Sequence, residues 1–315
     1  MSTATPSPPQ GRLDFVDLVR GLALLAMAIY HFAYDLSFFG LIETDVPTDP
    51  AWRIFARSIA GSFLVLVGFS LVLATRKRLN GPAILKRLGT VVAAAALVTV
   101  GTAYAIPQDF IFFGILHHIA LASVLALLFL RLPTLAIAAA AVASFALPSF
   151  IAAEWLDEPW LVWLGFSRLP LRSADFVPLF PWFGCTLAGM VLGRLALPHL
   201  QRLGRWRARA MPSRVLAWSG RHSLFVYLVH QPVLIGSLLL AMQLGLGGDR
   251  EAQAFLRPCE LSCRQGSDPQ SCAKLCSCAM TGLKREDLWR KTLDDTLLPA
   301  ETARAREIGQ ACARR

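Results

Sequence analysis

Three residues in one apolar stretch near the start of the chain have side chains that hydrocarbon rejects. The stretch VRGLALLAMAIYHFAYDLSFFG, residues 19–40, is apolar enough to cross a membrane, yet it contains Arg20, His31 and Asp35. A charged group at the centre of a bilayer costs about 2.5–3.5 kcal/mol on insertion scales. We therefore expect these side chains to face a protein-lined interior.

The spacing of His31 and Asp35 is that of a general base and a carboxylate that supports it. Residues four apart share one face of a helix, and the carboxylate can fix the imidazole tautomer and stabilise its protonated form. The alternative is a histidine that only hydrogen-bonds to a neighbouring helix. A His–Asp pair together with an arginine in one span favours a functional role over this purely structural one. We therefore predict His31 and Asp35 to be catalytic.

Other polar residues lie in the same segment and in later apolar segments. Asp17 and Arg20 form an i,i+3 pair, in which the cation can meet phosphate groups, although both could simply be interface anchors. His117 and His118 lie in FFGILHHIAL, and His230 lies in SLFVYLVHQPVL. Adjacent helical residues point about 100° apart, so at most one of the first two easily faces the same cavity as His31.

Several familiar motifs are absent from the sequence. It contains no GxxxxGK[ST] loop, no HExxH and no GxSxG. The glycine-rich LGLGG, residues 244–248, follows a membrane segment, so it is not a dinucleotide fingerprint. No compact spacing of metal ligands occurs in the apolar segments, and we predict no metal there.

The composition indicates an integral membrane protein. Of the 315 residues, 55% are hydrophobic and 17% charged, and the mean hydropathy is +0.51, whereas soluble domains are about 25% charged. A spanning helix needs about 20 apolar residues. Seven segments qualify, which predicts an all-α, polytopic membrane helix bundle of about seven spans: residues 16–42, 54–75, 86–106, 110–130, 132–153, 176–197 and 222–247.

The charges predict how these spans are oriented. The loops at 75–87 and 194–214 are densely basic and contain no acid, whereas those at 43–50, 107–109 and 153–160 are acidic or neutral. With seven spans the two sets fall on opposite sides, so the positive-inside rule predicts a cytoplasmic N-terminus and an outside C-terminus. The chain's net charge is +10, but its charges cluster in loops between apolar segments, which argues against a nucleic-acid partner.

Composition divides the chain into three parts. We expect a disordered N-terminus at residues 1–11, a transmembrane domain at 12–247, and a polar extracytoplasmic tail at 248–315 that holds six of the seven cysteines. An oxidising compartment favours disulfides.

The tail contains a twin Cys-x₃-Cys pattern, Cys259/Cys263 and Cys272/Cys276. Cysteines four apart share one helix face, so we predict two antiparallel helices joined by Cys259–Cys276 and Cys263–Cys272. Four cysteines allow three pairings, and a zinc site is the alternative. Cys278 and Cys312 would form a third bridge.

Five stretches together resemble the bacterial branch of the heparan-alpha-glucosaminide N-acetyltransferase catalytic-domain family. They are RLDFVDLVRGLALLAMAIYHFAYDL, FLVLVGFSL, FFGILHHIAL, PLFPWFG and SLFVYLVHQP, and the resemblance covers residues 12 to about 245. RG followed by a membrane histidine also resembles the wider group of membrane acyltransferases, in which that histidine, here His31, is held to be catalytic. In the lysosomal member the corresponding place holds Asn.

The resemblance implies a multi-pass enzyme, located in a bacterial inner membrane with a periplasmic tail. It implies transfer of an acetyl or other acyl group from cytoplasmic acetyl-CoA to an extracytoplasmic sugar or amine. His31 would be the general base or a transient acyl carrier. Arg20, His117 and His230 would contact the donor, and no metal is expected.

Two other functions remain as alternatives. A transporter or permease could use His31 and Asp35 as a proton relay, but transporters often contain internal repeats and none is visible here. A scaffold that displays the cysteine-rich tail has no need for histidine and aspartate in the middle of a span.

Overall fold

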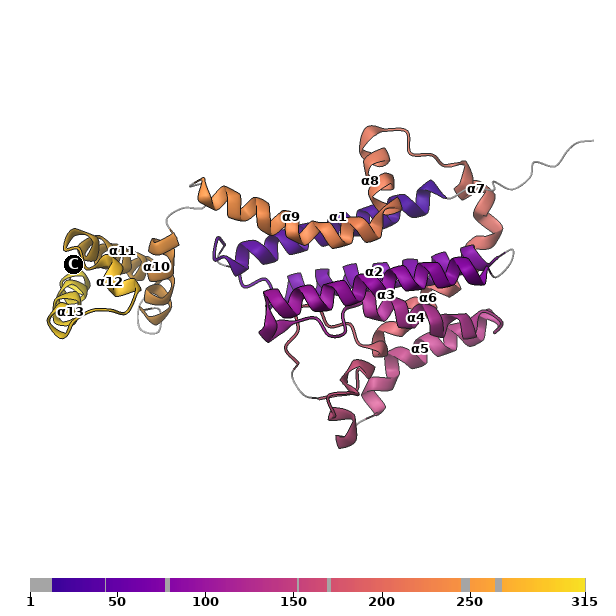
Figure 1. Ribbon diagram of the computed structural model, residues 1–315, viewed down its shortest axis with the longest axis horizontal. Helices are drawn as coiled ribbons and strands as arrows, with labels where there is room; N and C mark the ends of the chain where they lie inside the picture. The colour runs from indigo at the N-terminus through magenta and orange to yellow at the C-terminus, as the bar shows by residue number, and fades with distance from the viewer. Residues whose placement is uncertain are drawn as a thin grey trace, which may run out of the picture. The chain divides into compact units, whose positions relative to one another are not determined.

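The computed structural model describes residues 13–42, 44–76, 80–151, 153–168, 171–244, 250–263 and 268–314. This part of the chain is helical and contains no strand, so the predicted all-α class is confirmed (Figure 1). The predicted disorder at 1–11 and the predicted boundary at 247–248 lie outside the described residues. The α-helices are α1 (Asp14–Phe38), α2 (Pro50–Thr75), α3 (Gly81–Ala105), α4 (Ile115–Phe129), α5 (Thr134–Phe150), α6 (Leu179–Ala196), α7 (Leu200–Arg205), α8 (Met211–Arg221), α9 (Ser223–Gln243), α10 (Arg250–Cys263), α11 (Pro269–Arg285), α12 (Trp289–Leu293) and α13 (Pro299–Ala313).

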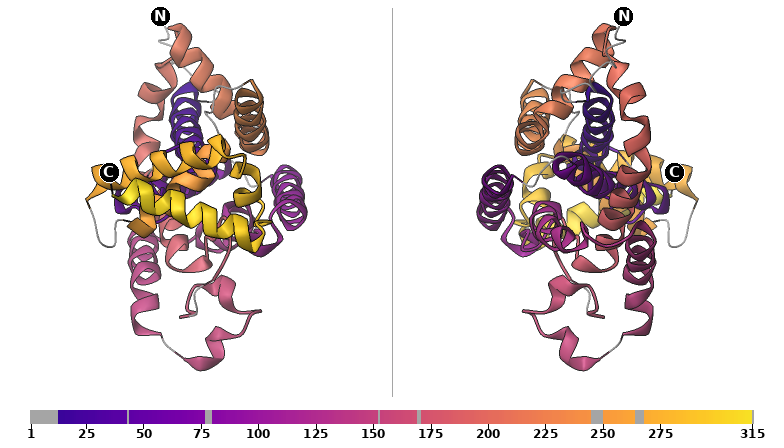
Figure 2. Two further views of the ribbon diagram at one scale, coloured as in Figure 1. Left: turned by 90° about the vertical axis from the view of Figure 1, so that its left-hand side faces the viewer. Right: turned by 90° about the vertical axis from the view of Figure 1, so that its right-hand side faces the viewer.

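The chain forms two compact units. The larger consists of Met1–Ser37 and Thr44–Leu234, and the smaller of Phe38–Glu43 and Ile235–Arg315. The long helices of the larger unit run roughly along one direction, and they are seen nearly end-on in Figure 2. The larger unit contains every residue of the candidate site.

Five helical stretches in the described residues are long and apolar enough to cross a membrane. They are α1, α2, α3, α9 and the stretch Leu179–Arg205, in which α6 continues towards α7. The predicted fourth and fifth spans form the shorter apolar helices α4 and α5, of 15 and 17 residues. Since a crossing needs about 20 residues, length and composition support five spans and leave these two helices short.

The fourth predicted span is short because non-helical backbone replaces its first turns. Residues before α4 and before α6 are hydrogen-bonded together: Ala174 N donates to Asp109 O over 2.8 Å, and Val177 N donates to Phe113 O over 3.1 Å. The Asp175 carboxylate also accepts from Ile115 N, the first residue of α4, over 2.8 Å. These bonds satisfy backbone groups that a helix would otherwise satisfy internally, as a non-aqueous environment requires.

Local sequence signals explain where the long helices begin. Asp49 accepts from the backbone N–H groups of Ala51 and Trp52 and so caps α2, with Pro50 at its first position. Asn80 caps α3 through Ala83 N. Side-chain oxygens in these positions satisfy N–H groups that have no partner within the helix.

Helices α2 and α6 pack at a distance that only glycine permits. A Cβ atom on Gly68 would lie 1.9 Å from Thr186 O, and one on Gly189 would lie 2.0 Å from Val65 O. The core beside this contact includes Leu187 and Met190 of α6, which are fully buried. The two glycines therefore fix the spacing of the helices that support the candidate site.

The smaller unit contains the three predicted disulfides. Cys259–Cys276 and Cys263–Cys272 join α10 to α11, and Cys278–Cys312 joins α11 to α13. Leu283, Leu288, Trp289 and Ile308 form its small core. With all six tail cysteines in disulfides, none supplies a thiolate for zinc.

We predict that Gly68→Ala destabilises the bundle while Gly89→Ala does not. The first substitution places a methyl group against the α6 backbone, and overpacking of this kind costs about 1–3 kcal/mol. Gly89 lies in α3 with open space around its Cβ position, and alanine favours a helix over glycine. Thermal unfolding in detergent measures both variants, and an unchanged midpoint for Gly68→Ala would contradict the close packing.

We predict that only Cys185 reacts with a maleimide reagent in the denatured, unreduced protein, because it is the one free cysteine. Mass-shift labelling should give one adduct for the wild-type protein and none for Cys185→Ser. Cys312→Ser should give two adducts, because it releases Cys278. A wild-type protein that takes up several adducts without reductant would refute the disulfides.

Candidate active site

The predicted pair Asp17–Arg20 is present and belongs to a larger polar cluster at the basic end of the bundle. Arg20 Nη1 lies 3.1 Å from Asp17 Oδ1 and 3.4 Å from Gly220 O, and Arg20 Nη2 donates to Ser70 Oγ over 2.9 Å. Arg221 Nε approaches Asp17 Oδ2 at 3.6 Å. The cluster joins α1, α2 and α8 and holds the Arg20 guanidinium in one place.

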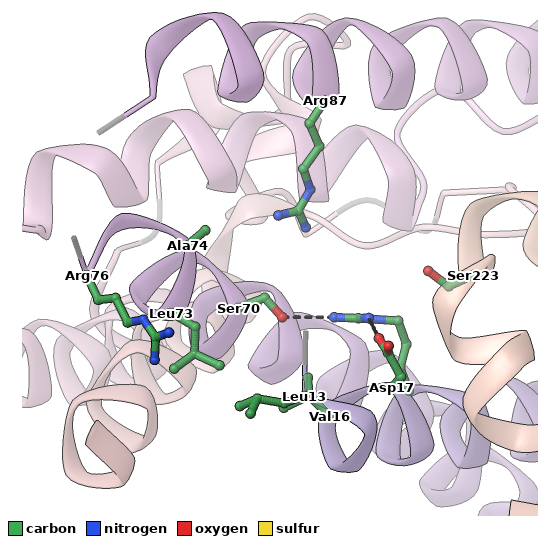
Figure 3. A pocket seen from close by; sticks show the side chains of 10 residues that line it. Leu13, Val16, Asp17, Ser70, Leu73, Ala74, Arg76, Arg87 and Ser223 are labelled. Carbon is green, nitrogen blue, oxygen red and sulfur yellow. Dashed lines mark hydrogen bonds and ion pairs between the residues drawn. The ribbon is translucent and has the colours of Figure 1, made fainter. Parts of the chain in front are cut away.

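A cavity of about 460 Å³ opens beside this cluster. Arg20, Arg76 and Arg87 line it together with Ser70 and Ser223, and Asp17 is its one acidic residue. Figure 3 shows Arg87 pointing from α3 into the space between the helices, opposite Ser70. Three guanidinium groups around one cavity make it a site for a polyanion, because guanidinium matches phosphate geometry.

A second cavity of about 460 Å³ shares Arg20, Arg87 and Ser223 with the first. Its lining comes from five helices and is mostly apolar: Leu24 of α1, Phe63, Leu66 and Val67 of α2, Val91 of α3, Ile115, Leu116 and Ile119 of α4, and Leu224 and Tyr227 of α9. Lys86 adds a further cation. The two cavities together connect a basic entrance to an apolar chamber with Tyr227 in its wall.

The structure brings His31 and His230 together. Their ring centroids are 4.9 Å apart, and the Tyr227 ring lies 5.6 Å from that of His230. His230 Nδ1 is bonded to Tyr227 O. Since a carbonyl only accepts, Nδ1 carries the hydrogen, which leaves the neutral ring a lone pair on Nε2. That Nε2 is enclosed and has no hydrogen-bond partner in the described part of the chain.

Asp35 is placed differently from the sequence-based expectation. No hydrogen bond or ion pair joins it to His31 among the described residues; instead its Oδ1 accepts from Gln231 Nε2 over 2.7 Å. Its Oδ2 is enclosed without a hydrogen-bond partner there. The two α1 residues thus meet two adjacent α9 residues, His31 with His230 and Asp35 with Gln231. The i,i+4 spacing places His31 and Asp35 on one face of α1. The packing of α9 against that face determines which residues they contact.

Both ring nitrogens of His117 are engaged in holding the start of α4. Gly114 N donates to Nδ1 over 3.2 Å, so Nε2 carries the hydrogen and donates to Thr99 Oγ1 over 3.1 Å. These bonds tie α4 to α3. No nitrogen of the ring is left for a bound molecule in this arrangement, in contrast with the predicted contact to the donor.

His118 points to the opposite side and is completely buried. Its Nδ1 lies 3.3 Å from Val177 O and 3.1 Å from Pro178 O, so this nitrogen donates to the segment before α6. It belongs to the hydrogen-bonded region at the start of α4. The two adjacent histidines therefore serve different neighbours, His117 the start of α4 and α3, and His118 the segment before α6.

No pattern in the sequence indicated that Asp175 lies near the candidate site. Its carboxylate accepts from Ile115 N over 2.8 Å and so caps α4. Burial raises its pKa to about 6, and the hydrogen bond from Ile115 N opposes that rise. A loop aspartate far along the chain acquires this position only through the fold.

No group of three or more histidine, cysteine, aspartate or glutamate residues in the described ranges is arranged to hold a metal ion. The polar groups described at and near the histidine pair are arginine, histidine, carboxylate and phenol side chains. These are groups for anion binding, hydrogen bonding and proton transfer.

Comparison with known proteins assigns the chain to a family. No curated protein and no solved structure shows significant similarity to it. Residues 12–232, which include both cavities and the histidine pair, match the family model described as "Heparan-alpha-glucosaminide N-acetyltransferase, catalytic". With five apolar helices of spanning length, the chain is an integral membrane protein and belongs to this family of membrane acetyltransferases.

Proposed function

We propose that the protein transfers an acetyl or other acyl group from acyl-CoA to a sugar or amine on the opposite side of the membrane. The observation that supports this most is the joined pair of cavities, which leads from Arg20, Arg76 and Arg87 to Tyr227. CoA is a polyanion at one end and carries its thioester at the end of a long, flexible arm. The basic entrance suits the phosphates and the apolar chamber suits the arm.

The histidine pair is the proposed reaction centre. His230 lies between Tyr227 and His31, so it is the histidine that meets the acyl end of the donor. His31 accepts a proton from the acceptor as general base, or carries the acyl group transiently. The Asp35 Oδ2, which has no protein partner in the described residues, accepts a hydrogen bond from the acceptor.

The proposed direction of transfer follows from the charges. The basic loops indicate a cytoplasmic side at the arginine-lined entrance, so the donor enters from the cytoplasm and the acceptor binds outside. In this arrangement the short helices α4 and α5 also cross the membrane, as the fourth and fifth of seven spans. The disulfide-bonded tail then lies in the periplasm of a bacterial inner membrane, where oxidation is favoured.

A reconstituted assay separates this proposal from a transporter. Purified protein is placed in liposomes that contain glucosamine, and radiolabelled acetyl-CoA is added outside. We expect labelled N-acetylglucosamine inside. Movement of unmodified glucosamine without acetylation would favour a permease that uses the histidines as a proton relay, and neither activity would favour a scaffold.

We predict that His31→Ala lowers the acyl-transfer rate by about 10²–10⁴-fold if His31 is the base. The matched control is His199→Ala, because His199 is exposed and lies outside both cavities. Both variants should elute as the wild type does in size-exclusion chromatography. Near-normal transfer by folded His31→Ala would rule out a catalytic role.

We predict that Arg20→Ala raises KM for acetyl-CoA more than KM for the acceptor, because Arg20 lines both cavities at the donor entrance. Arg202→Ala, which removes an exposed cation from α7, is the control for loss of charge alone. Steady-state kinetics with each substrate varied in turn gives both constants. Equal increases in the two KM values would indicate that the Asp17–Arg20 pair only stabilises the fold.

A further inference from the structure

Tyr227 lies where three groups of packed residues meet. Tyr227 packs against three clusters of buried residues: Leu24, Met27 and Ile59; Leu64, Ile115 and Val177; and Ala94, Ala95 and Leu116. It also lines the apolar cavity. These contacts come from four helices besides its own, so the ring position is fixed by packing.

The Tyr227 hydroxyl is left available. It makes no hydrogen bond to the described part of the chain, although a tyrosine hydroxyl in a packed interior usually has a partner. It is also not one of the polar atoms that the protein encloses completely, and its residue lines the apolar cavity. A donor group held in place by its ring and left without a protein partner is suited to a bound molecule.

If the phosphates of a bound donor contact the cations of the cavity, the reactive end of that donor lies near the Tyr227 hydroxyl. Arg20 and Arg87 line both cavities together with Ser223, the first residue of α9. Tyr227 lies about one turn further along α9, next to His230. A molecule whose phosphates meet the cations therefore extends its other end towards Tyr227. For acyl-CoA that end is the thioester.

We propose that the Tyr227 hydroxyl donates a hydrogen bond to the carbonyl oxygen of the donor's thioester and stabilises the negative charge that develops there during transfer. This role rests on the proposed function. It makes Tyr227 a further catalytic residue, one that neither the sequence pattern nor the family match identifies. A fixed donor at such an oxygen contributes about 10²–10³ in kcat.

The step balances without any further reactant. The acceptor's nitrogen or oxygen attacks the carbonyl carbon, and the carbonyl oxygen takes up negative charge while it accepts from Tyr227. The carbon–sulfur bond then breaks, the carbonyl re-forms, and CoA leaves as a thiolate. The proton lost by the acceptor passes through His31 to that thiolate, so the products are the acylated acceptor and CoA. Tyr227 keeps its proton throughout.

A purely structural role for Tyr227 is the alternative, because its ring contributes to three packed groups. Removal of the hydroxyl alone separates the two roles, since Tyr227→Phe keeps the ring and its contacts. Free CoA has no acyl carbonyl, so its binding depends on the cavity and its cations but not on the proposed hydrogen bond. Tyr104→Phe is the matched control, because Tyr104 lies at the end of α3 and is 87% exposed.

The experiment measures acetyl transfer from acetyl-CoA to glucosamine and, separately, the binding of CoA by isothermal titration calorimetry. For Tyr227→Phe we expect kcat to fall by about 10²–10³-fold with the Kd for CoA unchanged, and Tyr104→Phe to match the wild type in both.

Three results would overturn the proposal. Wild-type kcat in Tyr227→Phe would refute the hydrogen bond while leaving the proposed function intact. Weaker CoA binding in parallel with the loss of rate would show that Tyr227 supports only the cavity. Absence of any transfer by the wild-type protein would refute the proposed function and, with it, this role.

Discussion

The Asp17 carboxylate, only 1% exposed, is the polar group on which the basic end of the bundle depends. It holds Arg20 within its own helix and contacts Arg221 of α8, while Arg20 reaches Ser70 of α2 and the backbone of α8. A buried carboxylate is costly unless charge-assisted hydrogen bonds compensate it. Here that compensation joins three helices at one point. The same arrangement fixes the Arg20 guanidinium where it lines both cavities, so the interaction that orders the helices also places the cation at which we propose that the donor's phosphates bind.

The site changes character from one end to the other. At the entrance are arginines and a lysine, further in the lining is apolar, and beyond Tyr227 lie two histidines and an aspartate. A polyanion with an uncharged arm matches this order of environments. Helices α1 and α9 contribute to all three parts, and the glycine contact with α6 fixes the position of α2, which lines both cavities. Function and packing are therefore difficult to separate here, which is why the proposed substitutions remove single functional groups.

The structure revises the chemistry expected from neighbouring residues in the sequence. The His31–Asp35 spacing indicated a hydrogen-bonded pair, whereas each residue instead meets a residue of α9. His117 was expected to contact the donor, yet both of its nitrogens serve the start of α4. In each case the helical period correctly gave the direction of the side chain. The partner depended on which helix packs opposite.

The sequence by itself determined the properties that arise from composition and local spacing. Hydropathy gave the helical membrane class, cysteine spacing indicated the two disulfides between α10 and α11, and i,i+3 geometry gave the Asp17–Arg20 pair. The tertiary structure decided the rest: the hydrogen-bonded loops that shorten α4, the placement of Asp175 at the start of α4, and the meeting of His31 with His230 some 200 residues later. Local patterns state which way a side chain points, because helix geometry is fixed. Which side chain it meets depends on helix packing, which is set by contacts between residues far apart in the chain.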